Sequence, residues 1–126
     1  LAVARFLEAD PRMSWVSYPG LEGDRNHALA AKYMPNGTCG VISFGVPGGR
    51  DTVSSLLDHF RMISIATHVA DARSCTLYPA GTTHRQLTEE QLEEAGVGID
   101  LVRLSCGIEN TADIIADLDQ ALAAVQ

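Results

Sequence analysis

The 126-residue chain has the composition of an ordinary globular domain, with 46% hydrophobic and 20% charged residues. A chain of this length can bury roughly two thirds of its unfolded surface, which is enough for one domain with its own core. The formal net charge of −7 argues against nucleic acid or an anionic membrane as a partner, because both require clustered Lys and Arg. The sequence contains no run of 18 apolar residues and no signal-peptide pattern, so we expect a soluble cytoplasmic protein.

The cysteines and histidines predict neither a disulfide framework nor a metal site. Cys39, Cys75 and Cys106 form no C-x-x-C pair, and each lies in a strand-like run. We therefore expect them to be small, buried hydrophobic residues. The four histidines show no ligand spacing such as H-x-x-x-H, so metal binding is not expected.

The first half of the chain predicts helices and strands in alternation. Val3, Phe6 and Leu7 recur at helical spacing, and no capping residue or initiator methionine precedes them. We therefore expect the chain to begin inside a longer helix of a longer protein. The pattern then predicts a strand at 14–17, a helix at 27–34 capped by Asp24 or Asn26, a strand at 40–46 and an amphipathic helix at 51–62.

The second half begins with two short predicted strands, at 63–69 and 75–78, which are joined by a turn. A helix with clear end signals follows. Thr88 and Gln91 form a capping box, and Leu87 and Leu92 can pack together as a hydrophobic staple. Gly96 is typical of a helix C-terminus, so this helix is expected to end there.

The last predicted strand carries an arginine on the side that faces away from the core. Alternate side chains of a strand point to opposite faces, so Val102, Leu104 and Cys106 form one apolar face. Arg103 and Ser105 share the other face. An arginine here can offer two parallel hydrogen bonds to a carboxylate, although it could equally be an exposed side chain or a partner of the nearby aspartate at position 100.

A C-terminal helix is predicted to cover the apolar face of this strand. Asn110 is its expected N-cap, with Asp113 at the third helical position. The buried stripe consists of Ile114, Ile115, Leu118, Leu122 and Val125.

Six short motifs occur in order along the chain. They are Y-P-G-L at 18–21, K-Y-M-P at 32–35, F-G-V at 44–46, A-D-A-R-S at 70–74 with T-T-H-R-Q-L-T at 82–88, and R-L-S at 103–105. Together they resemble the C-terminal part of the Cys/Met-metabolism family of pyridoxal-phosphate (PLP) enzymes. Within that family the chain is most similar to O-acetylhomoserine sulfhydrylases. Tyr78 and Gly81 stand where the family usually has His and Ser.

The resemblance also bears on the fold class. Alternating strands and helices usually indicate a parallel, doubly wound sheet. The family resemblance instead implies an α+β domain, in which helices pack on one face of a small, mainly antiparallel sheet. The residues support this one-sided cover, because the strand positions opposite the apolar set are polar. These positions are Ser43, Ser64, His68, Thr76, Arg103 and Ser105.

The resemblance implies three substrate-binding residues. Arg103 would grip the α-carboxylate of an amino-acid substrate, and Ser74 would donate its backbone N–H to the same group. Thr83, between Thr82 and His84, would lie near the substrate entrance. Taken without the family, Ser74 is a turn residue and the Thr/His segment is a solvated loop, so these alternatives stay open.

The family's cofactor lysine lies in an S-x-T-K motif that this chain does not contain, and its only lysine is Lys32. We therefore expect residues 1–126 to be the C-terminal substrate-binding domain of a PLP-dependent transferase, with the PLP-binding domain upstream. This piece alone should be inactive, with no catalytic or cofactor-binding residue of its own.

The resemblance implies a reaction of methionine biosynthesis in a homotetramer: O-acetyl-L-homoserine and sulfide would give homocysteine and acetate. Alternatives within the family are cystathionine γ-synthase, cystathionine γ-lyase and methionine γ-lyase. An alternative from another class is a free-standing module that binds amino acids for regulation.

Overall fold

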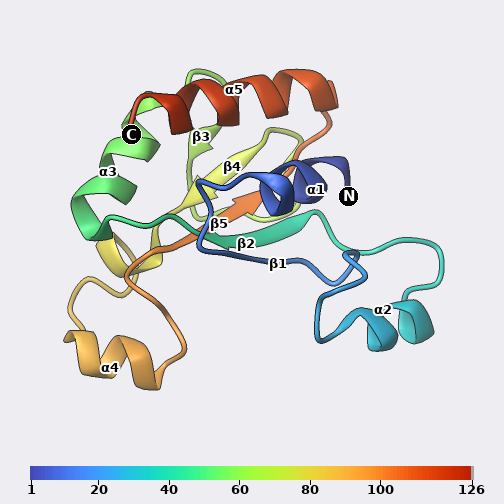
Figure 1. Cartoon of the computed structure of the whole chain (residues 1–126), viewed down its shortest axis with the longest axis horizontal. Coiled ribbons are helices and arrows are strands. Elements are labelled where there is room, and N and C mark those ends of the chain that lie inside the picture. Colours follow the sequence, from blue (N-terminus) through green and yellow to red (C-terminus); the bar gives the residue numbers. More distant parts are fainter. Residues whose placement is uncertain (126) are drawn as a thin grey trace.

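The computed structural model of the chain describes residues 1–125 and is organised around one five-stranded sheet (Figure 1). The strands are β1 (Trp15–Ser17), β2 (Val41–Gly45), β3 (Ser64–Ile65), β4 (Cys75–Leu77) and β5 (Leu101–Ser105). Their order in the sheet is β1-β2-β5-β4-β3, so β5 is the central strand. The β3–β4 pair is parallel and the other three pairs are antiparallel. The expected α+β fold with a mainly antiparallel sheet is thus confirmed.

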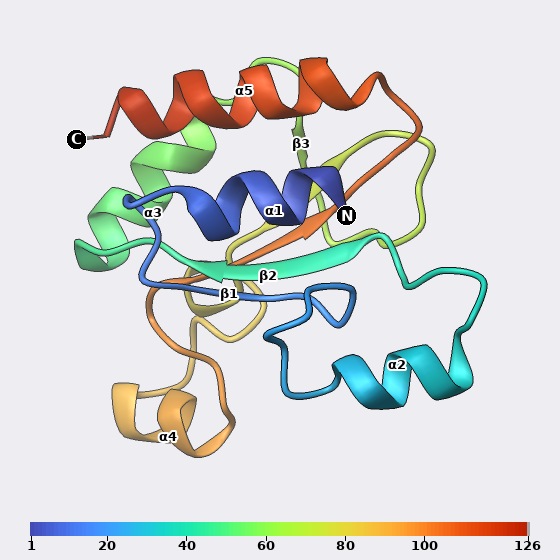
Figure 2. The same ribbon diagram turned by 45° about the vertical axis from the view of Figure 1, so that its right-hand side comes forward.

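The helices are distributed unequally over the two faces of the sheet. They are α1 (Ala2–Ala9), α2 (His27–Tyr33), α3 (Gly49–His59), α4 (Glu89–Glu94) and α5 (Thr111–Ala123), with a short 3₁₀ helix η1 (Pro79–Gly81). Figures 1 and 2 show α1, α3 and α5 together on one side, while α2 and α4 lie near opposite ends of the other side. Within residues 1–125, no helix is both long and apolar enough to cross a membrane.

The core lies between the sheet and the layer formed by α1, α3 and α5. Phe44 is paired with Val102, and Ile42 with Leu104, so these four side chains share one face of the sheet. All four are buried, and so are the apolar residues of the covering helices. The helix residues that contribute most are Val3 and Leu7 of α1, Val53 and Leu56 of α3, and Ile114, Leu118 and Leu122 of α5. Burial of apolar surface on this scale is the main force that holds the layers together.

Three expectations from the sequence were wrong. The strand predicted at 63–69 contains only β3, because the chain leaves the sheet after position 66 and forms a loop. Thr76 pairs with Leu104 and therefore lies on the core face rather than the polar face. Cys39 is exposed, because it lies in the segment before β2 and outside the sheet.

Helix ends follow their local signals closely. The Gln91 N–H donates to Thr88 Oγ1 at 3.3 Å and the Thr88 N–H donates to Gln91 Oε1 at 3.0 Å, so the capping box of α4 is confirmed. Gly96 follows α4 with φ of 71°, a left-handed conformation that favours glycine. Asn110 caps α5 by accepting the Ala112 N–H at 2.9 Å. Asn26 precedes α2 but makes no side-chain cap bond.

A buried aspartate, which the sequence did not single out, joins α5 to the segment before β3. Asp117 is 6% exposed, and its carboxylate accepts the backbone N–H groups of Arg61, Met62 and Ile63, each at 2.9 Å. Burial would raise the pKa of this carboxyl, but the three backbone hydrogen bonds outweigh it and hold the pKa below its ordinary value. The ionised form of Asp117 is therefore part of the folded structure.

We predict that Asp117→Asn lowers the free energy of unfolding at pH 7 by about 2–3 kcal/mol, because an amide cannot accept all of these hydrogen bonds. The lowered pKa means that unfolding takes up a proton in acid. The contribution of Asp117 should therefore be complete above its unfolded pKa of about 3.9 and fall away below it. Urea unfolding at a series of pH values measures both effects. Asp58→Asn, at an exposed position of α3, is the matched control, and equal losses in the two variants would contradict the prediction.

Candidate functional site

Arg103 lies in the middle of the sheet, on the face opposite the core. Its partners in the two neighbouring strands are Ser43 of β2 and Leu77 of β4. Ser43 and Arg103 are each half-buried, whereas the core-face residues next to them are fully buried. This second face of the sheet, which we call the open face, carries the candidate site.

The guanidinium of Arg103 is hydrogen-bonded through only one of its three nitrogens within residues 1–125. Its Nη2 donates to the backbone carbonyl of Thr67 at 2.8 Å and approaches that of His68 at 3.4 Å. Its Nε is buried and has no hydrogen-bond partner among the described residues. Buried donors are nearly always paired in folded proteins, so an unpaired Nε indicates that a partner is missing. A carboxylate can bind two guanidinium donors at once, and within residues 1–125 only Nη2 of this guanidinium is engaged.

The alternative partner for Arg103 is already engaged elsewhere. Asp100 Oδ2 accepts hydrogen bonds from Ser14 Oγ at 3.0 Å and from Trp15 Nε1 at 2.9 Å. Asp100 therefore joins the start of β5 to β1, and the suggested Asp100–Arg103 pair is not formed. Within residues 1–125, the hydrogen-bond acceptors of the Arg103 guanidinium are two backbone carbonyls, and no carboxylate pairs with it.

Ser74 does not offer the free donor that the family resemblance implied. It is fully buried, and its N–H donates to Glu109 Oε1 at 2.7 Å while its Oγ donates to Glu109 Oε2 at 2.9 Å. The Gly107 N–H in turn donates to Ser74 Oγ at 2.9 Å. Burial would raise the pKa of Glu109, but the hydrogen bonds from Ser74 hold it below its ordinary value. A carboxylate of the protein itself thus accepts the Ser74 N–H here, and a substrate-binding role for Ser74 stays a prediction.

The Thr/His loop lies directly after η1, which itself packs against β5. Thr83 is exposed, and its hydroxyl lies 2.9 Å from His84 Nδ1. Thr82 Oγ1 donates to the Tyr78 carbonyl at 2.6 Å and so closes the end of η1. Among residues 1–125, no hydrogen bond joins this loop to Arg103 or to the segment that holds its guanidinium. A role for Thr83 at the substrate entrance stays a prediction.

The structure adds the loop between β3 and β4 to the site. Its residues 67 and 68 supply the carbonyls that hold Arg103, and the Ala70 N–H donates to Ser105 Oγ at 3.1 Å. The sequence contained a signal for a turn in A-D-A-R-S, but that signal could not indicate which strand the loop would contact. The open-face side chains of β5 fix this loop.

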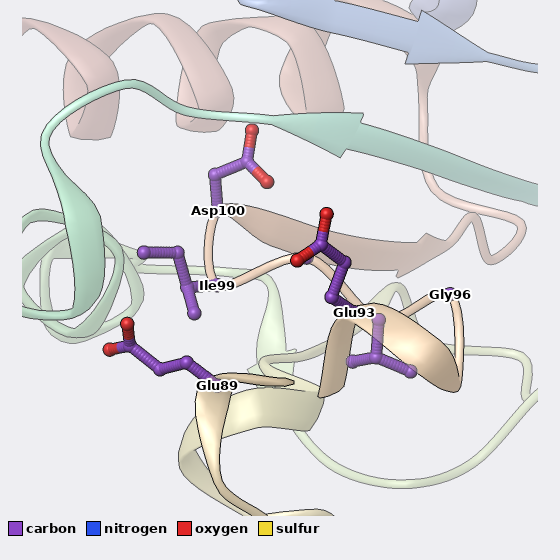
Figure 3. Close-up of a pocket in the computed structure, with 7 residues that line it drawn as sticks. Glu89, Glu93, Gly96, Ile99 and Asp100 are labelled. Atoms are coloured by element: carbon purple, nitrogen blue, oxygen red, sulfur yellow. The ribbon is translucent and has the colours of Figure 1, made fainter. Parts of the chain in front are cut away.

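A separate pocket lies between α4 and the segment that leads into β5 (Figure 3). Glu89, Glu93 and Asp100 contribute carboxylates to its lining, together with Val97 and Ile99. None of the three predicted substrate-binding residues lines it. Its negative charge would oppose a substrate carboxylate, so it is not the expected site.

Comparisons with known proteins cover almost the whole chain. The family model for Cys/Met metabolism PLP-dependent enzymes matches residues 1–123. Homocysteine synthase of Schizosaccharomyces pombe is 47% identical over 121 residues, which cover 96% of this chain and 28% of that protein. O-acetyl-L-homoserine sulfhydrylase of Leptospira meyeri is 42% identical over 123 residues, which cover 97% of this chain and 28% of that protein.

Solved structures of two enzymes match the fold closely. One, described as an O-acetylhomoserine (thiol)-lyase of Campylobacter jejuni, gives a TM-score of 0.88 at 37% identity and covers 97% of this chain and 29% of its own. The other, a cystathionine γ-lyase of Micromonospora echinospora, gives 0.88 at 34% identity and covers 97% of this chain and 32% of its own. The chain thus spans less than a third of the length of these relatives. It belongs to the Cys/Met metabolism family of PLP-dependent enzymes.

Proposed function

We propose that these residues form the C-terminal, substrate-binding domain of an O-acetyl-L-homoserine sulfhydrylase, in which Arg103 binds the α-carboxylate of the substrate. The observation that carries the proposal is the half-buried Arg103 guanidinium on the open face, whose hydrogen bonds within residues 1–125 are only those of Nη2 to two backbone carbonyls. A carboxylate bound there would receive charge-assisted hydrogen bonds from a group that the Thr67 carbonyl already orients. This contact would fix the orientation of an amino-acid substrate.

The described residues do not fit the cofactor, although PLP is the cofactor of this family. The Campylobacter jejuni structure contains a pyridoxyl-lysine phosphate residue. Lys32, the only lysine in this chain, is exposed on α2, and its Nζ lies 5.0 Å from the centre of the Tyr33 ring. A cofactor lysine requires an enclosed site that lowers its pKa and orients the cofactor ring. We therefore propose that the cofactor is held outside these residues, and that this chain contributes binding rather than reacting groups.

Sulfide as the second substrate, assembly into a homotetramer and a cytoplasmic location belong to the same proposal. The relatives named homocysteine synthase and O-acetyl-L-homoserine sulfhydrylase favour this member of the family. A second candidate is a cystathionine lyase, which the Micromonospora structure favours because its TM-score is equally high. Turnover of O-acetylhomoserine with sulfide, compared with turnover of cystathionine and of methionine, distinguishes these activities in a full-length protein.

The first prediction from this proposal concerns the cofactor. The 126-residue chain should show no absorbance band of a lysine–PLP imine when it is mixed with PLP, because Lys32 lies in solvent and not in a pocket. Borohydride followed by mass spectrometry should find no stoichiometric label on Lys32. Specific and complete labelling of Lys32 would overturn the proposal that the cofactor is bound elsewhere.

The second prediction concerns the carboxylate anchor. In the full-length enzyme, Arg103→Ala should lower kcat/KM for O-acetylhomoserine by roughly two to three and a half decades, which corresponds to a loss of about 3–5 kcal/mol for a desolvated charge pair. Arg103→Lys should recover part of this loss, because a point charge cannot form the two parallel bonds. Stability should fall only modestly, by about 0.5–1.5 kcal/mol, since the bonds to the loop carbonyls are lost.

Arg5→Ala is the control for this experiment, because it removes the same charge from an exposed position of α1, on the other side of the sheet from the open face. The control should leave kcat/KM almost unchanged. If Arg103→Ala loses stability but keeps kcat/KM within about threefold of the wild type, Arg103 has a structural role and the proposal is wrong.

A further inference from the structure

Three hydrogen bonds join the open face of β5 to residues 67–70, which we call the 67–70 segment. Arg103 makes two of them through Nη2, to the carbonyls of Thr67 and His68. Ser105 makes the third, because its Oγ accepts the N–H of Ala70 at 3.1 Å. Arg103 and Ser105 lie two positions apart in one strand, so their side chains leave the sheet on the same side. The segment is therefore held at both of its ends by neighbouring side chains.

The backbone of this segment is strained at the point where Ser105 holds it. Ala70 has φ of 57°, and it is the one non-glycine residue with positive φ within residues 1–125. A side chain with a Cβ atom disfavours this left-handed conformation, so surrounding contacts must maintain it. The bond from the Ala70 N–H to Ser105 is the side-chain contact that fixes this position.

We propose that Ser105 is a positioning residue that orients the Arg103 guanidinium through the 67–70 segment. Ser105 is 1% exposed, so its hydroxyl is too deeply buried to bind substrate itself. It fixes Ala70, and this in turn fixes the carbonyls of Thr67 and His68 that hold one corner of the guanidinium. The inference rests on the proposed carboxylate-binding role of Arg103 and deepens it.

Loss of the Ser105 hydroxyl releases the strain at Ala70 and lets the segment move. The guanidinium then loses fixed acceptors and samples orientations in which it cannot offer two aligned donors to a carboxylate. Because the carboxylate contact is present in both the bound substrate and the transition state, KM should rise while kcat changes little. The selectivity for a carboxylate should fall together with the affinity.

The experiment uses the full-length enzyme and two inhibitors, L-norleucine and L-norleucinamide, which differ only in the carboxylate. The ratio of their inhibition constants measures carboxylate selectivity directly. Ser105→Ala should reduce this ratio about threefold to tenfold, the factor expected for one lost hydrogen bond, and should raise KM for O-acetylhomoserine by a similar factor. Ser17→Ala is the matched control, because it removes a serine hydroxyl that donates to Asp24 at 3.0 Å from the edge strand β1. The control should leave the ratio unchanged.

Two further variants separate positioning from a general loss of stability. Ala70→Gly should restore selectivity in the Ser105→Ala background, because glycine adopts the left-handed conformation without strain. In the Arg103→Ala background, Ser105→Ala should change the ratio by less than about 1.5-fold, since it acts through Arg103. If the effects of Ser105→Ala and Arg103→Ala on the logarithm of the ratio were fully additive, the positioning role would be overturned.

The possible outcomes distinguish this inference from the proposed function. If Arg103→Ala itself leaves the carboxylate selectivity unchanged, the proposed role of Arg103 fails and the positioning role fails with it. If Arg103→Ala abolishes selectivity while Ser105→Ala behaves like Ser17→Ala, only the positioning role is overturned. Selectivity lost in Ser105→Ala and regained with Ala70→Gly supports both.

Discussion

The alternation of side chains along β5 is the constraint on which both the core and the candidate site depend. Val102 and Leu104 are completely buried beneath the helical layer, and this fixes which face of the strand is apolar. Arg103 then necessarily points to the open face, because successive residues of a strand face opposite sides. A shift of one residue would bury the arginine and expose the core residues, so antiparallel pairing with β2 and β4 also secures the site.

Two carboxylates in the C-terminal part of the chain bind the residues that precede β3 and β4, and so hold the loop between these two strands in place. Asp117 of α5 accepts three N–H groups just before β3, and Glu109 binds the N–H and hydroxyl of Ser74 just before β4. Hydrogen bonds to ionised groups are stronger than those between neutral groups. The loop that contacts Arg103 is therefore fixed at both ends, and the orientation of the guanidinium follows from bonds far apart in the sequence.

The sequence predicted the features that depend on local patterns. Apolar periodicity and end signals located the five α-helices and five strands of residues 1–125, although not η1, and the Thr88/Gln91 pair correctly indicated a capping box. The face of Arg103 followed from alternation alone. Thr76 was assigned to the wrong face, because a three-residue strand is too short for its own pattern to fix the register.

The features that sequence reasoning missed arise from contacts between distant residues. Helical spacing from Ile114 places Asp117 beside the buried stripe of α5. It could not indicate the partners of Asp117, because they lie more than fifty positions away in the segment before β3. The family resemblance assigned the N–H of Ser74 to the substrate, whereas its bond to Glu109, 35 positions later, had no local signal in the sequence. The family resemblance predicts Arg103 as a binding residue, and this role stays a prediction; the structure shows that its Nη2 binds loop carbonyls from residues 67 and 68.

The central claim is that the open face of β5 holds the carboxylate of an amino acid. A crystal structure of the full-length protein with a bound, unreactive amino-acid substrate analogue tests it most directly. We predict a carboxylate oxygen about 3 Å from a guanidinium nitrogen of Arg103. An analogue whose carboxylate binds elsewhere, while Arg103 keeps its present partners and its Nε meets another part of the protein, would contradict the account.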